Sequence, residues 1–63
     1  MPSIHVEMFK GRTIEQKREM VKEITEVVSR TANCPKEAIR IVINEMEFEN
    51  FALGGVLKCD NQK

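Results

Sequence analysis

Pro2, Arg12 and Arg40 are the residues of this 63-residue chain whose types and positions suit proton transfer on an anion. Pro2 follows Met1 directly, and because proline is small enough for the initiator methionine to be removed, we expect a free N-terminal secondary amine. Such an amine is a base and a nucleophile, and its ring fixes the geometry of the nitrogen. A guanidinium presents a planar fork of donors that binds a carboxylate at two points. Together these residues indicate acid–base chemistry on a carboxylate.

Pro2 and Arg12 also have plainer explanations. Pro2 follows the start codon in many unrelated chains, and if Met1 is retained, the proline nitrogen is an amide that accepts no proton. Arg12 stands in a loop just ahead of an expected helix, where a solvated cation is common. Neither residue defines an active site without the rest of the chain.

Arg40 interrupts a strand that is otherwise almost entirely apolar. A buried or half-buried arginine is costly unless its charge is paired. One explanation is a structural ion pair, with Glu45 or with Glu7 of a neighbour. The other is a receptor for an anionic ligand. The sequence leaves both open.

The remaining reactive residue types do not point to another chemistry. His5 is the only histidine and stands on the polar side of its strand, so we expect a surface or interface residue. Cys34 and Cys59 are too few for a disulfide scaffold or a zinc site and are expected to be reduced thiols. Metal binding has almost no support, and Gly54-Gly55 lacks the residues that complete a phosphate loop.

Composition excludes several other classes of function. Ten basic residues balance ten acidic ones, so there is no net charge to attract nucleic acid or an anionic membrane. The sequence shows no signal peptide and no membrane-spanning run, so a cytoplasmic protein is expected. Residues 1–63 are expected to form a single domain. A monomer of this size would be marginally stable, which favours self-association.

The elements that position these residues can be predicted from periodicity. Residues 3–9 alternate apolar and polar side chains, which predicts a strand with one dry face. Thr13 and Gln16 are spaced as a capping box, and apolar residues then recur at the spacing of an amphipathic helix. The helix is expected to run from Ile14 to Ala32 and to end at Asn33, which tolerates a left-handed conformation.

A second strand is predicted over residues 39–46, whose near-continuous apolar character suggests burial on both faces. Strand, helix and strand form a βαβ unit with two parallel strands. Residues 47–50 are expected to form a turn or short tight helix, Gly54-Gly55 a hairpin turn, and residues 59–63 a frayed end. The fold class is therefore α+β.

One helix covers only one face of a two-stranded sheet. The other face must then meet another chain, so the subunit is expected to be assembled as an oligomer. A single chain of this size also has too little concavity for an active site, which favours a site at a subunit junction.

The order and spacing of these features resemble the 4-oxalocrotonate tautomerase family over nearly the whole chain. The matching features are Pro2, Gly11-Arg12, Glu15-Gln16-Lys17, Arg40, Glu45-Met46, Phe51 and Gly54-Gly55. The resemblance implies a homohexamer built as a trimer of dimers, with no metal or organic cofactor. It also implies an enzyme that interconverts the enol and keto forms of unsaturated 2-hydroxy dicarboxylates such as 2-hydroxymuconate, from the catabolism of aromatic compounds.

Carried over by position, the resemblance makes Pro2 the general base. It makes Arg40 the residue that engages the substrate's 2-oxygen and neighbouring carboxylate, and Arg12 the residue that holds the distal carboxylate. Phe51 would form part of an apolar wall, and residues of one site would come from more than one subunit. Apolar surroundings and nearby guanidinium groups would lower the pKa of the proline amine towards neutrality, where a general base works best.

The chain departs from the family pattern at one position. Many members carry a serine two residues before the strand-two arginine, where this chain has Ala38. One polar contact to substrate is therefore expected to be absent, which leaves the preferred substrate open. The alternatives are a relative that uses the same amine for hydration, dehalogenation or phenylpyruvate-type tautomerisation, and a non-catalytic oligomeric scaffold if Met1 is retained.

Overall fold

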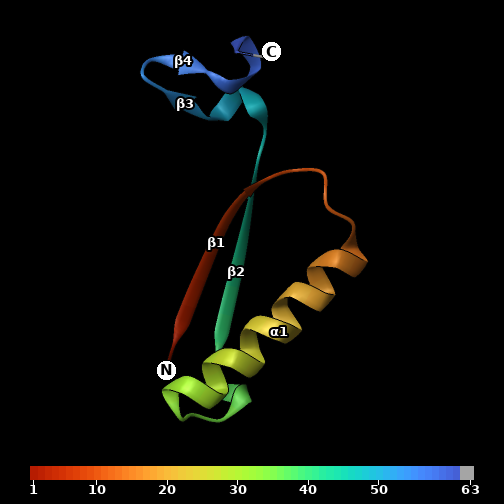
Figure 1. The fold of residues 1–63 in the computed structure, drawn as a ribbon, viewed down its shortest axis with the longest axis vertical. Helices are drawn as coiled ribbons and strands as arrows, with labels where there is room; N and C mark the ends of the chain where they lie inside the picture. Colours follow the sequence, from red (N-terminus) through yellow and green to blue (C-terminus); the bar gives the residue numbers. More distant parts are fainter. Residues whose placement is uncertain (62–63) are drawn as a thin grey trace.

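The computed structural model describes residues 1–61, which form a βαβ unit followed by a small hairpin (Figure 1). The helix and strands are β1 (Ser3–Phe9), α1 (Ile14–Ala32), β2 (Arg40–Met46), β3 (Ala52–Leu53) and β4 (Val56–Leu57). Short 3₁₀ turns lie at Lys36–Ala38, Phe48–Asn50 and Lys58–Asp60. The α+β prediction of two parallel strands, one crossover helix and a C-terminal hairpin is confirmed.

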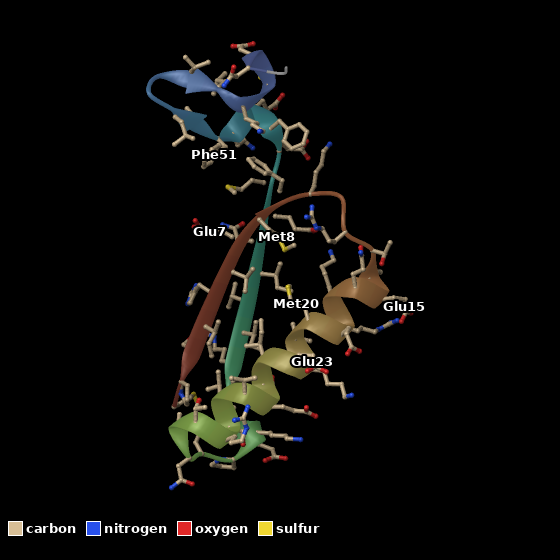
Figure 2. All side chains as sticks on the ribbon, in the orientation of Figure 1. Glu7, Met8, Glu15, Met20, Glu23 and Phe51 are labelled. Atoms are coloured by element: carbon tan, nitrogen blue, oxygen red, sulfur yellow. The ribbon has the colours of Figure 1, made fainter. Side chains whose placement is uncertain are left out.

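The two long strands lie side by side and parallel, with Ser3 opposite Arg40 and Phe9 opposite Met46. Side chains alternate between the faces of such a pair. Apolar pairs such as Ile4 with Ile41 are half-buried on the face that α1 covers. Figure 2 shows Met8 between the sheet and the helix. The strand-one prediction is therefore confirmed in its bounds and in its one dry face.

The opposite face of the sheet, called here the outer face, has no element of the same subunit over its central part. It carries Ser3, His5, Glu7, Arg40, Val42 and Asn44, all exposed. Val42 keeps 36% of its surface accessible. The burial of β2 on both faces that its composition suggests is thus not reached within one subunit.

The crossover helix begins after its N-cap Thr13 and ends before its C-cap Asn33, as the sequence predicts. The Thr13 N–H donates to Gln16 Oε1 at 2.8 Å, and the Gln16 N–H donates to Thr13 Oγ1 at 3.1 Å. These reciprocal bonds are the predicted capping box, and they satisfy amide groups that the first turn leaves unpaired. At the other end Asn33 takes left-handed angles, φ 56° and ψ 58°. Both predicted helix ends are confirmed.

Two boundaries after the helix differ from the sequence prediction. Ile39 closes the 3₁₀ turn through a hydrogen bond from its N–H to the Lys36 carbonyl at 3.1 Å, so β2 begins at Arg40. The predicted frayed end is wrong for Cys59 and Asp60, because Lys58–Asp60 form a 3₁₀ turn that the N–H of Asn61 closes on the Lys58 carbonyl. Residues 62–63, which belong to the same prediction, lie outside the described part.

The hairpin confirms the predicted turn at Gly54-Gly55. Both glycines have positive φ, 60° and 84°. Such a pair of angles suits a two-residue turn whose twist matches antiparallel strands, and glycine adopts it without steric cost. Figure 1 shows the hairpin beyond the end of the two long strands, at the opposite end of the subunit from the N-terminus.

The described subunit is thin and has no interior of its own. Its principal extents are 43 × 25 × 15 Å, and its radius of gyration is 15.1 Å. A compact domain of this length would have a radius of gyration of about 11 Å. Within residues 1–61 no side chain is buried, and Leu53 keeps 72% of its surface accessible. A single subunit therefore lacks the apolar burial from which small domains gain much of their folding free energy.

Two further findings concern the cysteines and the helix. Cys34 and Cys59 are both unbridged thiols in the described part of the chain. Among the same residues, no helix combines the length and the apolar character that a membrane crossing requires.

Thr13→Ala is expected to lower the free energy of unfolding by about 1 kcal/mol, because it removes the hydroxyl that caps the helix. The measurement is urea unfolding at fixed protein concentration. Thr31→Ala is the matched control, since Thr31 is exposed within the last helical turns and bonds only to the Val27 carbonyl. Equal losses in the two variants would show that the cap does not contribute specifically.

Candidate active site

Pro2 and Arg40 are brought together at the amino ends of the two long strands. The Pro2 carbonyl accepts a hydrogen bond from the Arg40 N–H at 3.0 Å. The register then places Ser3 directly opposite Arg40. Pro2 is half-buried and Arg40 is exposed. Parallel pairing thus places the expected base beside a guanidinium-bearing residue, although the two are 38 positions apart in the chain.

Arg12 and Phe51 lie towards the other end of the sheet. Arg12 stands in the loop between β1 and α1, and Phe51 follows β2 after a short turn. A strand of seven residues spans about 20 Å from first to last Cα. One subunit therefore holds Pro2 and Arg40 at one end of the sheet and has Arg12 and Phe51 towards the other, and no cavity is present within residues 1–61. That the residues of one site come from more than one subunit stays a prediction.

Arg40 does not form the ion pair with Glu45 that the sequence left open. The carboxylate of Glu45 instead accepts a hydrogen bond from Lys17 Nζ at 2.9 Å, which ties the first turn of α1 to the end of β2. Within the described residues, neither Arg40 nor Arg12 has an ion-pair partner. Both guanidinium groups are thus available for an anionic ligand or for another chain.

The hairpin is joined to β1 by a cluster of three aromatic rings that sequence reasoning did not foresee. The ring of Phe9 meets Phe48 at 5.0 Å and Phe51 at 5.2 Å between centroids, both edge to face. Lys58 Nζ lies 5.8 Å from the centre of the Phe9 ring. A sequence signal was present, because Met8 and Phe9 are both apolar and break the alternation of the strand.

A second link between the same segments is electrostatic. Lys10 Nζ lies 2.7 Å from Glu47 Oε1, on the exposed surface. The hydrogen bond to Glu47 and the attraction between the two charges raise the pKa of Lys10. The Lys10 N–H also donates to the Met46 carbonyl at 3.0 Å, which extends the strand pairing by one bond.

His5 and Ala38 make no side-chain hydrogen bond or ion pair within the described residues. His5 is exposed on the outer face, opposite Val42. Ala38, in place of the serine common in the resembled family, is half-buried in the 3₁₀ turn two residues before Arg40. Among residues 1–61, no three histidine, cysteine or acidic side chains are grouped in a way that could hold a metal ion.

The fold is a small βαβ subunit in which Pro2 and Arg40 lie side by side at one end of the strand pair. A protein-family profile described as "Tautomerase enzyme" matches residues 2–61, beginning at Pro2. The chain belongs to the tautomerase family, and its neighbours place it with the 4-oxalocrotonate tautomerase homologues.

Individual relatives support this assignment over more than nine-tenths of the chain. A probable tautomerase of Streptococcus thermophilus is 46% identical over 61 residues, covering 97% of this chain and 100% of that protein. The crystal structure of YwhB, a homologue of 4-oxalocrotonate tautomerase, has a TM-score of 0.91 at 38% identity and covers 97% of this chain and 100% of its own. A 4-oxalocrotonate tautomerase isozyme of Methylibium petroleiphilum has a TM-score of 0.85 at 41% identity and covers 92% and 91%.

Proposed function

We propose that the protein is a tautomerase that interconverts the enol and keto forms of an unsaturated 2-hydroxy or 2-oxo dicarboxylate resembling 2-hydroxymuconate. The observation that carries the proposal is the backbone hydrogen bond from the Arg40 N–H to the Pro2 carbonyl, which holds Pro2 beside Arg40 at the amino ends of the two long strands. Within residues 1–61 the Arg40 guanidinium has no ion-pair partner. Membership of the tautomerase family supports the reaction class.

Pro2 is the general base in this proposal, acting as a secondary amine once Met1 is removed. It takes the proton from the substrate's 2-hydroxyl group and delivers it to a carbon of the conjugated chain. The neutral amine is required for the first step. The charge of Arg40 nearby disfavours the protonated ring, since like charges repel. A base tuned near neutrality contributes typically ~10²–10⁴-fold to the rate.

Arg40 and Arg12 bind the two ends of the diacid. Arg40 engages the 2-oxygen and the adjacent carboxylate, where negative charge develops as the proton leaves. Arg12 holds the distal carboxylate, and Phe51 supplies the apolar wall around the conjugated chain. Because Arg12 and Phe51 lie about 20 Å from Pro2 along the strand pair, a second subunit supplies them to each site.

Self-association follows from the same geometry. The thin subunit leaves the outer face and the hairpin uncovered, and apolar residues such as Leu53 are exposed there. We propose that residues 1–63 act as one domain that assembles as a homohexamer, a trimer of dimers, in the cytoplasm. The proposed reaction needs no metal or organic cofactor, because the amine itself moves the proton.

Pro2→Ala is expected to lower kcat for 2-hydroxymuconate by about 10²–10⁴-fold, because the tuned ring amine is replaced by an ordinary primary amine. The measurement is an ultraviolet assay of ketonisation. Alanine also permits removal of Met1, so intact-mass analysis of both proteins confirms that each has lost one methionine. Unchanged turnover in the trimmed variant would contradict the role of Pro2. Retention of Met1 in the native protein would favour a non-catalytic scaffold instead.

Arg40→Ala is expected to lower kcat by about 10²–10³-fold, because it removes a donor to the developing oxyanion. Arg12→Ala is expected to raise KM about 10- to 100-fold, because it removes a charge-assisted contact that substrate makes before and during reaction. Steady-state kinetics separate the two parameters. Arg30→Ala, which removes an exposed arginine from the last turn of α1, is the matched control and should leave both unchanged. Identical small effects at all three positions would contradict the assignment.

The unfolding temperature is expected to rise with protein concentration, because a subunit that buries no side chain within residues 1–61 gains its stability from assembly. The measurement combines thermal unfolding at several concentrations with sedimentation, which should give six times the subunit mass. A monomer with a sharp, concentration-independent transition would contradict the assembly.

A further inference from the structure

The hairpin that carries Phe51 depends on few contacts with the rest of its own subunit. It lies beyond the end of the strand pair (Figure 1), and Figure 2 shows Phe51 at this end of the molecule. The backbone between Met46 and Phe51 is a short turn. The bond from the Lys10 N–H to the Met46 carbonyl and the Lys10–Glu47 ion pair join the end of β1 to the start of this turn. Neither of them reaches Phe51, so the contact of the Phe51 ring with β1 depends on another side chain.

Phe9 is the side chain that makes this connection. It is the last residue of β1, and its ring is shared between two edge-to-face contacts, with Phe48 and Phe51. The two contacts nearly match in distance, 5.0 and 5.2 Å, and in interplanar angle, 75° and 87°. Such pairs have a preferred geometry, so they restrict orientation in a way that aliphatic packing does not.

Phe51 is held from its backbone as well. Its carbonyl accepts a hydrogen bond from the Lys58 N–H at 2.7 Å. The same lysine extends its ammonium group towards the Phe9 ring, where a cation is attracted to the aromatic face. Phe9, Phe51 and Lys58 thus form a closed set of contacts, in which the Phe51 ring meets Phe9 and its backbone is fixed by the residue that also reaches Phe9.

We propose that Phe9 is a positioning residue: its ring sets the orientation of Phe51 relative to Arg12, which follows Phe9 by three positions in the same segment. The role rests on the proposed function, in which Arg12 and Phe51 of one subunit bind the same substrate. Phe9 acts through Phe51, so its loss weakens substrate binding more than it slows the proton transfer at Pro2.

The experiment compares Phe9→Leu with Phe48→Leu in the assembled protein. Each variant removes one ring from the aromatic cluster, but only Phe9→Leu removes the partner of Phe51. Because the chain has three phenylalanines, labelling with 4-fluorophenylalanine gives three ¹⁹F resonances in the native protein, assigned by single Leu substitutions. The Phe51 resonance reports ring order without any substrate, and steady-state kinetics with 2-hydroxymuconate report KM and kcat.

In Phe9→Leu we expect the Phe51 resonance to move towards the value of the unfolded chain and KM to rise about two- to tenfold, the fold-change that matches the stabilisation of an edge-to-face pair. kcat should change less than KM. In Phe48→Leu the Phe51 resonance and KM should stay close to native values. Phe9→Tyr, which keeps the ring, should restore both.

An unmoved Phe51 resonance in Phe9→Leu would overturn the proposal, as would equal effects of Phe9→Leu and Phe48→Leu. If leucine prevents assembly, Phe9→Met is measured by the same criteria, and failure of both to assemble would show that Phe9 supports the whole subunit and does not position Phe51 specifically. Native protein without activity would contradict the proposed function, while the ¹⁹F result would still decide whether Phe9 orders Phe51.

Discussion

One helix can cover only one face of a two-stranded sheet, and the stability and assembly of this subunit depend on that limit. The apolar half of the sheet packs against α1, while the outer face and the hairpin stay accessible. Among its described residues the chain has neither a disulfide nor a second long helix to cover the outer face. The apolar burial that stabilises most small domains must then come from other chains, so folding and assembly are coupled.

Parallel strand pairing distributes the chemistry between two ends of the subunit. Both strands start at the same end of the sheet, which brings Pro2 to Arg40. Both strands finish at the opposite end, and Arg12 and Phe51 follow them in the sequence. An antiparallel pair would have placed the residue after one strand beside the residue before the other. The division of the proposed site among subunits is thus a direct result of topology.

Sequence reasoning succeeded where the determinants are local. The ends of α1 follow from the capping box at Thr13 and from the left-handed Asn33, which act within a few residues. It failed where contacts join distant segments. The pairing of Glu45 with Lys17, and of Phe9 with Phe51, depends on how the helix and hairpin pack, and no periodicity in one segment reports on the other. The predicted roles of Pro2, Arg12, Arg40 and Phe51 stay predictions, supported by family membership.

The uninterrupted pairing of seven residues between β1 and β2 fixes the distance between the two ends of the subunit in the proposed assembly. Each subunit would contribute its amino-terminal pair to one site and its carboxyl-terminal pair to another. Insertion of one residue within either strand would lengthen that strand by about 3 Å and turn the following side chains to the other face. Evolution could then exchange strand residues other than Arg40 and Phe9, while the number of residues between the two ends of each strand would be held constant.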